Sequence, residues 1–325
     1  MKSKLFTHLL WRVQLSILRA CPPLSGIVTR ISMGAATSRR VWVQTFLKLT
    51  VRIPGALLQN CRDRAKKRVV LPCVSLPITT RCTLRCDKCL AHIPDVKNPR
   101  DIPIDEWAQD AHALFSCIDY AYIVELSGGE PFLHPDLGKA LRLCADSGKV
   151  GHIVVLSNAT VIPEPGMLAA LREAKANVLI SKYSCVPAAK AEELKRVLDE
   201  NSISYMYKGV SFWRDAGNFG QLQAGSAKRR FSLCSLTQCS IYLEGKLHRC
   251  NGKAAILIEE GLLSDCQEDY IDLRVIHSDS FSEQWKKLLK KRFITACSYC
   301  LGSTYCSPKV PVAVQREYNQ RRDIT

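Results

Sequence analysis

Residues 74–208 alternate between short apolar runs and longer amphipathic stretches, and this alternation limits the possible folds more than any other feature. The apolar runs have the length of strands, and the amphipathic stretches repeat with helical spacing. Such alternation favours parallel strands joined by crossover helices. We expect strands at Val74–Thr80, Ala121–Leu126, His152–Leu156, Val178–Ser181 and Ser204–Lys208, and helices at Ile104–Ile118 (capped by Asp101), Asp136–Asp146, Glu164–Ala174 and Ala188–Asn201.

Polar loops follow the first three of these strands. The first loop carries three cysteines within Arg81–Leu90, the second is Ser127-Gly-Gly-Glu-Pro131, and the third is Ser157-Asn-Ala-Thr160. Functional sites in such folds gather at the C-terminal ends of the strands. The sequence therefore predicts one site at one edge of the sheet.

The cysteines of the first loop, Cys82, Cys86 and Cys89, have the spacing C-x3-C-x2-C. Three thiolates can hold three irons of a [4Fe–4S] cluster and leave the fourth iron open to a small molecule. The alternatives are a zinc site or unrelated thiols. Zinc normally takes four ligands, no fourth cysteine lies close by in the sequence, and His92 is the only nearby substitute.

A second group of cysteines lies toward the C-terminus of a chain that has 16 in all. Two separated groups in a large protein without a secretory signal indicate metal sites more often than disulfides. We expect a hairpin at Cys239–Cys250 that turns at Glu244-Gly245, and a basic helix at Ser282–Phe293. The candidate ligands are Cys234, Cys239, Cys250, Cys297, Cys300 and Cys306, and a structural zinc site is the alternative.

The cysteine triad followed by Ser127–Asp136 resembles the radical S-adenosylmethionine (SAM) superfamily, over about residues 70–210. The resemblance implies that the open iron binds SAM. It also implies that an electron from the cluster cleaves SAM to methionine and a 5′-deoxyadenosyl radical, which abstracts a substrate hydrogen. The implied SAM contacts are Gly128, Gly129 and Glu130 for the methionine moiety, Ser157 and Asn158 for the ribose, and Ser181. One departure is Lys88, which stands where the family usually has an aromatic residue.

The C-terminal region resembles the SPASM/twitch appendages of the same superfamily, through Cys234–Gly245–Cys250 and Cys297-x2-Cys300-x5-Cys306. The resemblance implies one auxiliary [4Fe–4S] cluster, held by Cys250, Cys297, Cys300 and either Cys239 or Cys234. Such a cluster accepts the electron that remains after hydrogen abstraction, which implies a two-electron oxidation. A reducing electron-donor protein is the implied partner.

The strings Ile180-Ser-Lys-Tyr183 and Phe212-Trp-Arg-Asp215 loosely resemble radical SAM proteins found with glycan-biosynthesis enzymes. This favours oxidation of an alcohol in a small, sugar-like substrate. A peptide-modifying maturase with a peptide substrate is the alternative enzyme. A non-catalytic metal-binding scaffold is the alternative from another class.

The net charge of +16 belongs mainly to residues 1–68, which have 14 basic residues against one acid, Asp63. Apolar residues recur there at helical spacing, in Leu5–Ile17 and Val41–Leu49. Three interpretations stay open: attachment to an anionic membrane surface, binding of an acidic partner or nucleic acid, or packing on the core. Nucleic acid is disfavoured because no zinc finger or aromatic stacking motif accompanies the charge.

These observations predict an α/β fold, a partial (β/α)6 TIM-like barrel with a small auxiliary-cluster domain and a basic N-terminal extension. No run of 18 uncharged apolar residues and no signal peptide is evident, so we expect a cytoplasmic protein, able to bind a membrane only peripherally. The expected divisions are an extension (1–69), a radical SAM core (70–210), a connector (211–233), an auxiliary-cluster domain (234–310) and a tail (311–325).

Overall fold

The computed structural model describes residues 16–17, 20–24, 53–217, 222–250, 261, 267–276 and 278–317. The strands of its main sheet are β2 Val74–Thr79, β4 Val124–Gly128, β5 Ile153–Ser157, β6 Asn177–Ser181, β7 Tyr205–Lys208, β9 Ser240–Leu243, β10 Lys246–His248 and β11 Tyr270–Asp272. They lie in the order β11-β10-β9-β2-β4-β5-β6-β7. Neighbours from β9 to β7 are parallel, whereas β10 and β11 are antiparallel additions. The sheet is therefore mixed.

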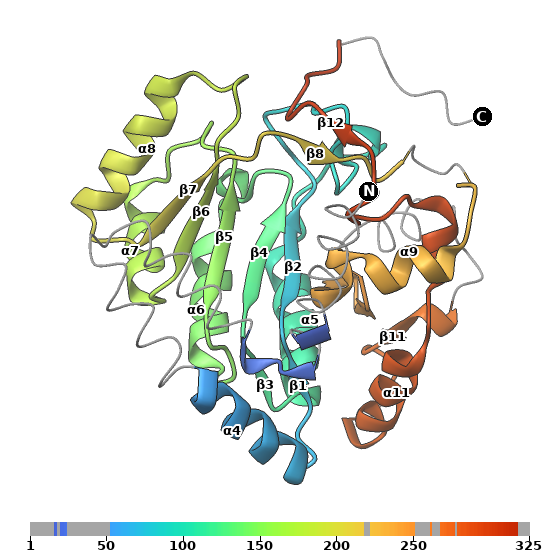
Figure 1. The fold of residues 1–325 in the computed structure, drawn as a ribbon. Helices are drawn as coiled ribbons and strands as arrows, with labels where there is room; N and C mark the ends of the chain where they lie inside the picture. Colours follow the sequence, from blue (N-terminus) through green and yellow to red (C-terminus); the bar gives the residue numbers. More distant parts are fainter. Residues whose placement is uncertain are drawn as a thin grey trace.

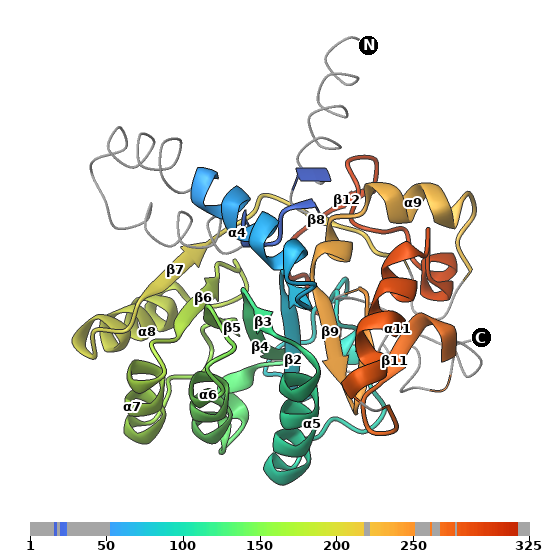
Figure 2. The same cartoon turned by 90° about the horizontal axis from the view of Figure 1, so that it is seen from below.

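Helices cover one face of the parallel strands. The helices are α4 Ile53–Ala65, α5 Ile104–Cys117, α6 Leu137–Asp146, α7 Pro165–Glu173, α8 Ala188–Glu200, α9 Ala227–Leu233 and α11 Ser278–Lys290. Figures 1 and 2 show α5, α6, α7 and α8 side by side against that face. Two short sheets complete the described strands, β1 Val70–Leu71 with β3 Tyr120–Ala121, and β8 Trp213–Arg214 with β12 Lys309–Val310.

The alternation of side chains along each strand separates the core from the site. Leu76, Leu126 and Ile180 are almost completely buried in the main apolar cluster. Their sequence neighbours point to the opposite face of the sheet. There, the Oγ atoms of Ser75 and Ser127 lie 2.6 Å apart on adjacent strands. One face of the sheet thus supplies packing and the other is polar enough to take part in a site.

The predicted strands and helices of residues 74–208 are all present, with ends that shift by at most a few residues. One detail of the prediction was wrong. Asp101 does not cap α5, because Pro103 occupies the N-cap position. Instead, the Asp101 carboxylate accepts hydrogen bonds from Thr79 Oγ1 (2.7 Å) and Arg81 Nη1 (2.6 Å). It therefore holds the start of the cysteine loop.

The C-terminal region joins the same sheet. The predicted hairpin is formed by β9 and β10, and its turn residues Glu244 and Gly245 both have positive φ, as a tight two-residue turn requires. Helix α11 begins before the predicted Ser282, because Phe281 opens the apolar stripe that also includes Trp285 and Leu288. Because β9 pairs directly with β2, the hydrogen bonds of the main sheet continue into the C-terminal region.

Part of the N-terminal extension is described. Helix α4 lies at the end of the sheet marked by β1 and β3, as Figure 2 shows, and its Asp63 accepts a hydrogen bond from Tyr122. The predicted helix at Val41–Leu49, and all but the last two residues of Leu5–Ile17, lie outside the described residues. No helix among the described residues is long and apolar enough to cross a membrane. The predicted barrel curvature and domain divisions stay predictions.

Candidate active site

The loops that follow β2, β4 and β5 meet with the end of β6 at a cavity of about 500 Å³. This is the edge where the sequence predicted a site. The cavity is lined by most of the predicted site residues, namely Cys82, Cys86, Cys89, Gly128, Gly129, Ser157, Asn158 and Ser181. The α/β topology explains the meeting, since the carboxyl ends of parallel strands share one edge of the sheet.

The cysteine loop is held at its start by polar contacts. The backbone N–H of Arg81 donates to Thr79 Oγ1 (3.0 Å), and the N–H of Leu84 donates to Cys82 Sγ (3.4 Å). Asn158 Nδ2 lies 3.6 Å from the same sulfur. N–H groups aimed at sulfur are typical of thiolate sites, because they stabilise negative charge.

The thiols of the triad fit a metal-bound state. Burial raises the pKa of Cys82 to about 11 and that of Cys86 to about 12, and it also raises the pKa of Cys89. The proximity of the other two thiols adds to the shift for both Cys82 and Cys86. Three such neighbours become thiolates at neutral pH only when a cation compensates their charge.

The spacing of the triad fits a cluster better than a single ion. A tetrahedral zinc ion with Zn–S of about 2.3 Å holds its sulfurs about 3.8 Å apart. Among the described residues, only Cys73, Glu125 and Cys239 form a group of three ligand atoms within 4.8 Å of one another. The triad is not such a group, so its sulfurs are spread more widely than one zinc requires. Ligands around a cube of four irons are expected to be so spread.

The glycines of Ser127–Pro131 let the second loop approach the first. The N–H of Gly129 donates to Thr79 O (2.9 Å), and the N–H of Glu130 donates to Arg81 O (2.8 Å). A Cβ on Gly129 would lie 2.0 Å from Arg81 O. At Gly128, where φ is +136°, a Cβ would lie 2.0 Å from Thr79 O. Only glycine permits this approach at either position.

Residues 76–210 match the radical SAM superfamily, and this range carries the triad and the loops described above. The chain therefore contains a radical SAM superfamily domain. A domain of this superfamily implies a [4Fe–4S] cluster and SAM, and the donor set of the triad fits the cluster.

Individual relatives of the radical SAM domain are distant. A GTP 3′,8-cyclase from Stenotrophomonas maltophilia (strain R551-3) is 31% identical over 93 residues, which is 28% of each chain. The chain thus spans well under two thirds of that relative. BtrN in complex with AdoMet and 2-DOIA is 14% identical, with a TM-score of 0.47, over 76% of this chain and 98% of BtrN. Streptococcus suis SuiB bound to precursor peptide SuiA has a TM-score of 0.38 and 15% identity, over 50% of this chain and 38% of SuiB.

Glu130 lies behind the cavity of the radical SAM domain. It is fully buried and is not among the described residues that line the cavity. Its carboxylate accepts hydrogen bonds from the N–H groups of Asn158 (2.7 Å) and Phe132 (3.3 Å). Burial raises its pKa to about 7, although these hydrogen bonds act in the opposite direction. Contact with the methionine moiety of SAM stays a prediction for Glu130. The structure itself shows a link between two site loops.

The third loop is also tied to the cysteines. Asn158 Nδ2 donates to Thr83 Oγ1 (3.2 Å), and Asn158 Oδ1 accepts from the N–H of Thr160 (2.9 Å). Ser157 Oγ accepts from the N–H of Ala159 (3.1 Å), which has a positive φ of 64°. The ribose contacts of Ser157 and Asn158 stay predictions. Both side chains line the cavity and shape the loop around it.

Several lining residues were given no site role from the sequence. Tyr183 follows β6 and packs edge-to-face on Trp213, with ring centroids 5.5 Å apart. Lys88 Nζ forms an ion pair with Asp215 Oδ2 (3.2 Å) at the same wall. The signal was present in the two strings at 180–183 and 212–215. Their shared position became evident only when the chain was folded.

The second cysteine group gathers around a separate small cavity. Four of the six candidates line it, Cys234, Cys250, Cys297 and Cys300. The N–H of Ser303 donates to Cys234 Sγ (3.2 Å), and the N–H of Gly302 donates to Cys300 Sγ (3.2 Å). Burial raises the pKa of Cys250, and the other three thiols of the group raise it further. This donor set suits a second cluster as the triad suits the first.

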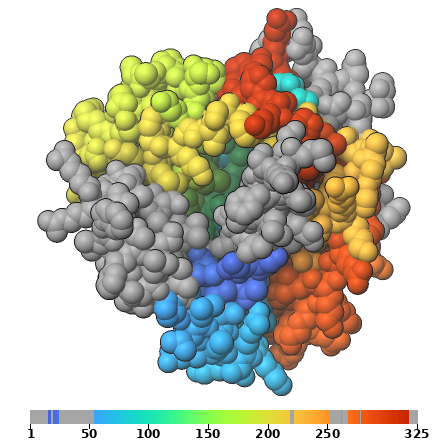
Figure 3. All heavy atoms as spheres, in the orientation of Figure 1, coloured from blue at the N-terminus to red at the C-terminus, as the bar shows by residue number. Residues whose placement is uncertain are grey.

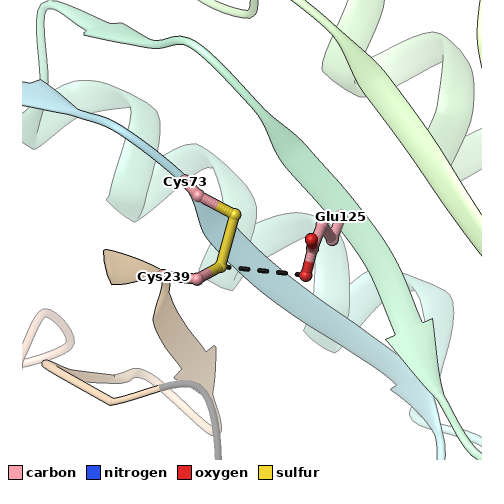
Figure 4. A group of neighbouring side chains, drawn as sticks. All are labelled: Cys73, Glu125 and Cys239. Carbon is pink, nitrogen blue, oxygen red and sulfur yellow. Dashed lines mark hydrogen bonds between the residues drawn. A yellow bond between two sulfur atoms is a disulfide. The ribbon is translucent and has the colours of Figure 1, made fainter. Parts of the chain in front are cut away.

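The other two candidates are placed elsewhere. Cys306 is exposed and is not among the described residues that line the second cavity. Cys239 forms a disulfide with Cys73, which Figure 4 shows. The two cysteines precede the adjacent parallel strands β9 and β2, so the sheet register places them opposite each other. Of the two expected alternatives, the structure thus brings Cys234 to the group and not Cys239.

Proposed function

We propose that this chain is a radical SAM enzyme that cleaves SAM reductively and abstracts a hydrogen atom from a substrate held in the main cavity. One observation carries the proposal. Three thiols from one loop, two glycines from a second and two polar residues from a third line a single cavity of about 500 Å³. The zinc-scaffold alternative is less well supported, because the triad is not a compact single-ion group among the described residues.

The cluster, when bound by Cys82, Cys86 and Cys89, would supply the electron that breaks a carbon–sulfur bond of SAM to give methionine and a 5′-deoxyadenosyl radical. The protein's part is orientation and seclusion. Backbone groups of Gly128 and Gly129 line the cavity beside the triad and can approach a ligand closely. Aromatic side chains on the far wall would exclude water from the radical.

The second cysteine group would hold an auxiliary [4Fe–4S] cluster, as in a twitch-type appendage. Its four thiols fit that role, because three are well shielded from water and two accept N–H groups. The auxiliary cluster would accept one electron. Together with transfer of a hydrogen atom to the deoxyadenosyl radical and loss of a proton from the hydroxyl, this oxidises an alcohol carbon to a carbonyl.

A small, sugar-like alcohol is the substrate class that we propose. The two strings behind this expectation, at 180–183 and 212–215, both contribute to the cavity wall. That wall combines aromatic faces with the cations of Lys88 and Arg214. A mainly apolar lining with a few placed polar groups is typical of small-molecule sites. The remaining divisions of the chain, the electron-donor partner and the cytoplasmic location are proposed as predicted from the sequence.

The first test is anaerobic reconstitution with iron and sulfide, followed by dithionite and SAM. We expect about eight irons per chain and release of 5′-deoxyadenosine. In the Cys82/Cys86/Cys89 triple alanine variant, iron should fall to about four and 5′-deoxyadenosine should vanish. Cys61→Ala, at an exposed thiol on α4, is the matched control and should change neither quantity.

Two outcomes would overturn the proposal. Bound zinc in place of iron would favour the scaffold. A fully loaded and reduced protein that forms no 5′-deoxyadenosine would exclude radical SAM chemistry.

A further inference from the structure

A segment from the extreme C-terminal part of the described chain is paired with the cysteine loop. The N–H of Asp87 donates to Val314 O (2.7 Å), and the N–H of Arg316 donates to Arg85 O (2.8 Å). Cys86 and Gln315 form an antiparallel bridge between these two hydrogen bonds. We name residues 313–316 the C-terminal clamp. It adds a short strand to the loop that carries all three cysteines.

The side chain of Gln315 reaches the sulfur of Cys86. Its Nε2 lies 3.3 Å from Cys86 Sγ and donates to Ala313 O (2.8 Å), while its Oε1 accepts from the N–H of Arg85 (2.8 Å). The amide carries two N–H bonds, so one can bind the carbonyl while the other points at sulfur. Cys86 itself is buried, with 7% of its surface exposed. The contact is therefore a directed N–H···S interaction at a proposed cluster ligand.

Arg316 anchors the C-terminal clamp. Its side chain is 3% exposed and forms a bidentate pair with Asp95, at 2.8 and 3.2 Å from Nη1 and Nη2. The Nη2 atom also donates to Asp87 O (3.1 Å). Asp95 follows the third cysteine and Asp87 follows the second. One arginine thus fixes the loop on both sides of Cys89, through an ion pair that only a planar guanidinium can make.

The chain reaches the C-terminal clamp from the second cysteine group. Between them, β12 pairs with β8 at the wall of the main cavity, and Arg214 donates to the carbonyl groups of Tyr305 and Ser307 (both 2.9 Å). In Figure 3 this C-terminal segment, in red, lies against the cyan surface of residues near the cysteine loop. Residues 297–316 therefore connect both cysteine groups along one continuous stretch.

We propose that the C-terminal clamp is a positioning element of the SAM-binding cluster, in which Gln315 donates a hydrogen bond to the Cys86 sulfur and Arg316 holds that donor in place. This inference rests on the proposed function, because it takes the triad as the cluster's ligands. Hydrogen bonds to ligand sulfur raise the reduction potential of an iron–sulfur cluster, because they stabilise the more negative, reduced state. Gln315 would thus make the cluster easier to reduce.

The test uses Gln315→Met in the full chain, reconstituted with iron and sulfide. Methionine has a similar length and no charge, and it lacks the N–H donor. Gln284→Met, at another exposed glutamine on α11, is the matched control. The reduction potential of the SAM-binding cluster is measured by redox titration with EPR detection. We expect the reduced-to-oxidised ratio at a fixed potential to fall about tenfold in Gln315→Met, a shift of about 59 mV. The control should not shift.

A second variant tests the anchor. Arg316→Lys keeps the charge but loses the bidentate geometry, and we expect its cluster to lose iron to a chelator about tenfold faster than that of the parent protein. Protection of the Asp87 amide from hydrogen exchange should fall in the same variant. Gln315→Glu keeps the acceptor for Arg85 and removes the amide donor. Its potential should also fall, while its rate of iron loss stays near that of the parent.

The failure of this inference can be told apart from failure of the proposed function. If the parent protein binds no [4Fe–4S] cluster at the triad, the proposed function fails first. If the cluster forms and cleaves SAM, but Gln315→Met leaves both its potential and its iron retention unchanged, the clamp has no positioning role.

Discussion

Replacing Gly129 with alanine is the most direct test of how the first two loops fit together. The new methyl group would lie 2.0 Å from Arg81 O, 2.5 Å from the Arg81 carbonyl carbon and 2.9 Å from Cys82 Cβ. Ordinary contact needs roughly 3.5 Å, so the loops must separate by more than 1 Å. Every one of these neighbours is backbone or the first atom of a side chain, and none can swing aside.

The expected loss follows from that displacement. Overpacking of this kind costs about 1–3 kcal/mol in stability, equivalent to a Tm lower by roughly 4–8 °C at about 2 kcal/mol for a chain of this size. A shift of about 1 Å between reacting groups lowers a rate by about 10²-fold. We therefore expect Gly129→Ala to cleave SAM at least 10²-fold more slowly.

The assay follows 5′-deoxyadenosine formation, iron content and thermal unfolding in parallel. Gly166→Ala on α7 is the matched control, because a Cβ there meets no heavy atom within 4 Å. It should keep full activity and be unchanged or slightly more stable, since alanine favours a helix over glycine. Wild-type SAM cleavage and unchanged Tm in Gly129→Ala would show that the two loops are not in the contact described.

Three further predictions concern residues around the site. Cys185 lies near Cys86, with Gln315 Nε2 3.6 Å from its sulfur, yet it is exposed; we expect Cys185→Ala to keep its iron and its SAM cleavage, and a loss of the SAM-binding cluster would reveal a fourth ligand. Cys73 and Cys239 lie outside both proposed ligand sets, so Cys73→Ala should bind as much iron as the parent, whereas alkylation and mass spectrometry should find Cys239 linked in the parent only; unequal iron would contradict this. Burial alone would raise the pKa of Asp95, but hydrogen bonds from His92 and Arg316 lower it to about 2. The unfolded chain then takes up a proton first, so the apoprotein should lose about 2 kcal/mol as pH falls from about 5 to 2, and Asp95→Asn should flatten that dependence whereas the exposed Asp105→Asn should not.

The sequence predicted the radical SAM part of the molecule well, because its signals are local. The strand and helix periods of residues 74–208 depend on neighbouring residues, and the cysteine spacing is set within one loop. The place where the loops meet then follows from parallel topology alone, which brings strand ends to one edge. Cys82, Gly129 and Asn158 could therefore be grouped without coordinates.

Contacts between distant parts of the chain could not be predicted in the same way. Gln315 follows Cys86 by 229 residues, and Cys239 follows Cys73 by 166. No periodicity links such pairs, because each depends on how the C-terminal region adds to the sheet. The choice between Cys234 and Cys239 had the same origin. Once β9 lies beside β2, its register assigns Cys239 to Cys73 and leaves Cys234 free to join the other group.

The parallel pairing of β9 with β2 has a consequence for how the protein is made. β2 is among the first strands to leave the ribosome, and its neighbour on that side is encoded more than 150 residues later. Until then its edge is open, and open edges invite pairing with other chains. A fragment that stops at residue 210 would keep that edge permanently, so we expect it to aggregate where the full chain does not. Iron loading would best wait until translation has ended.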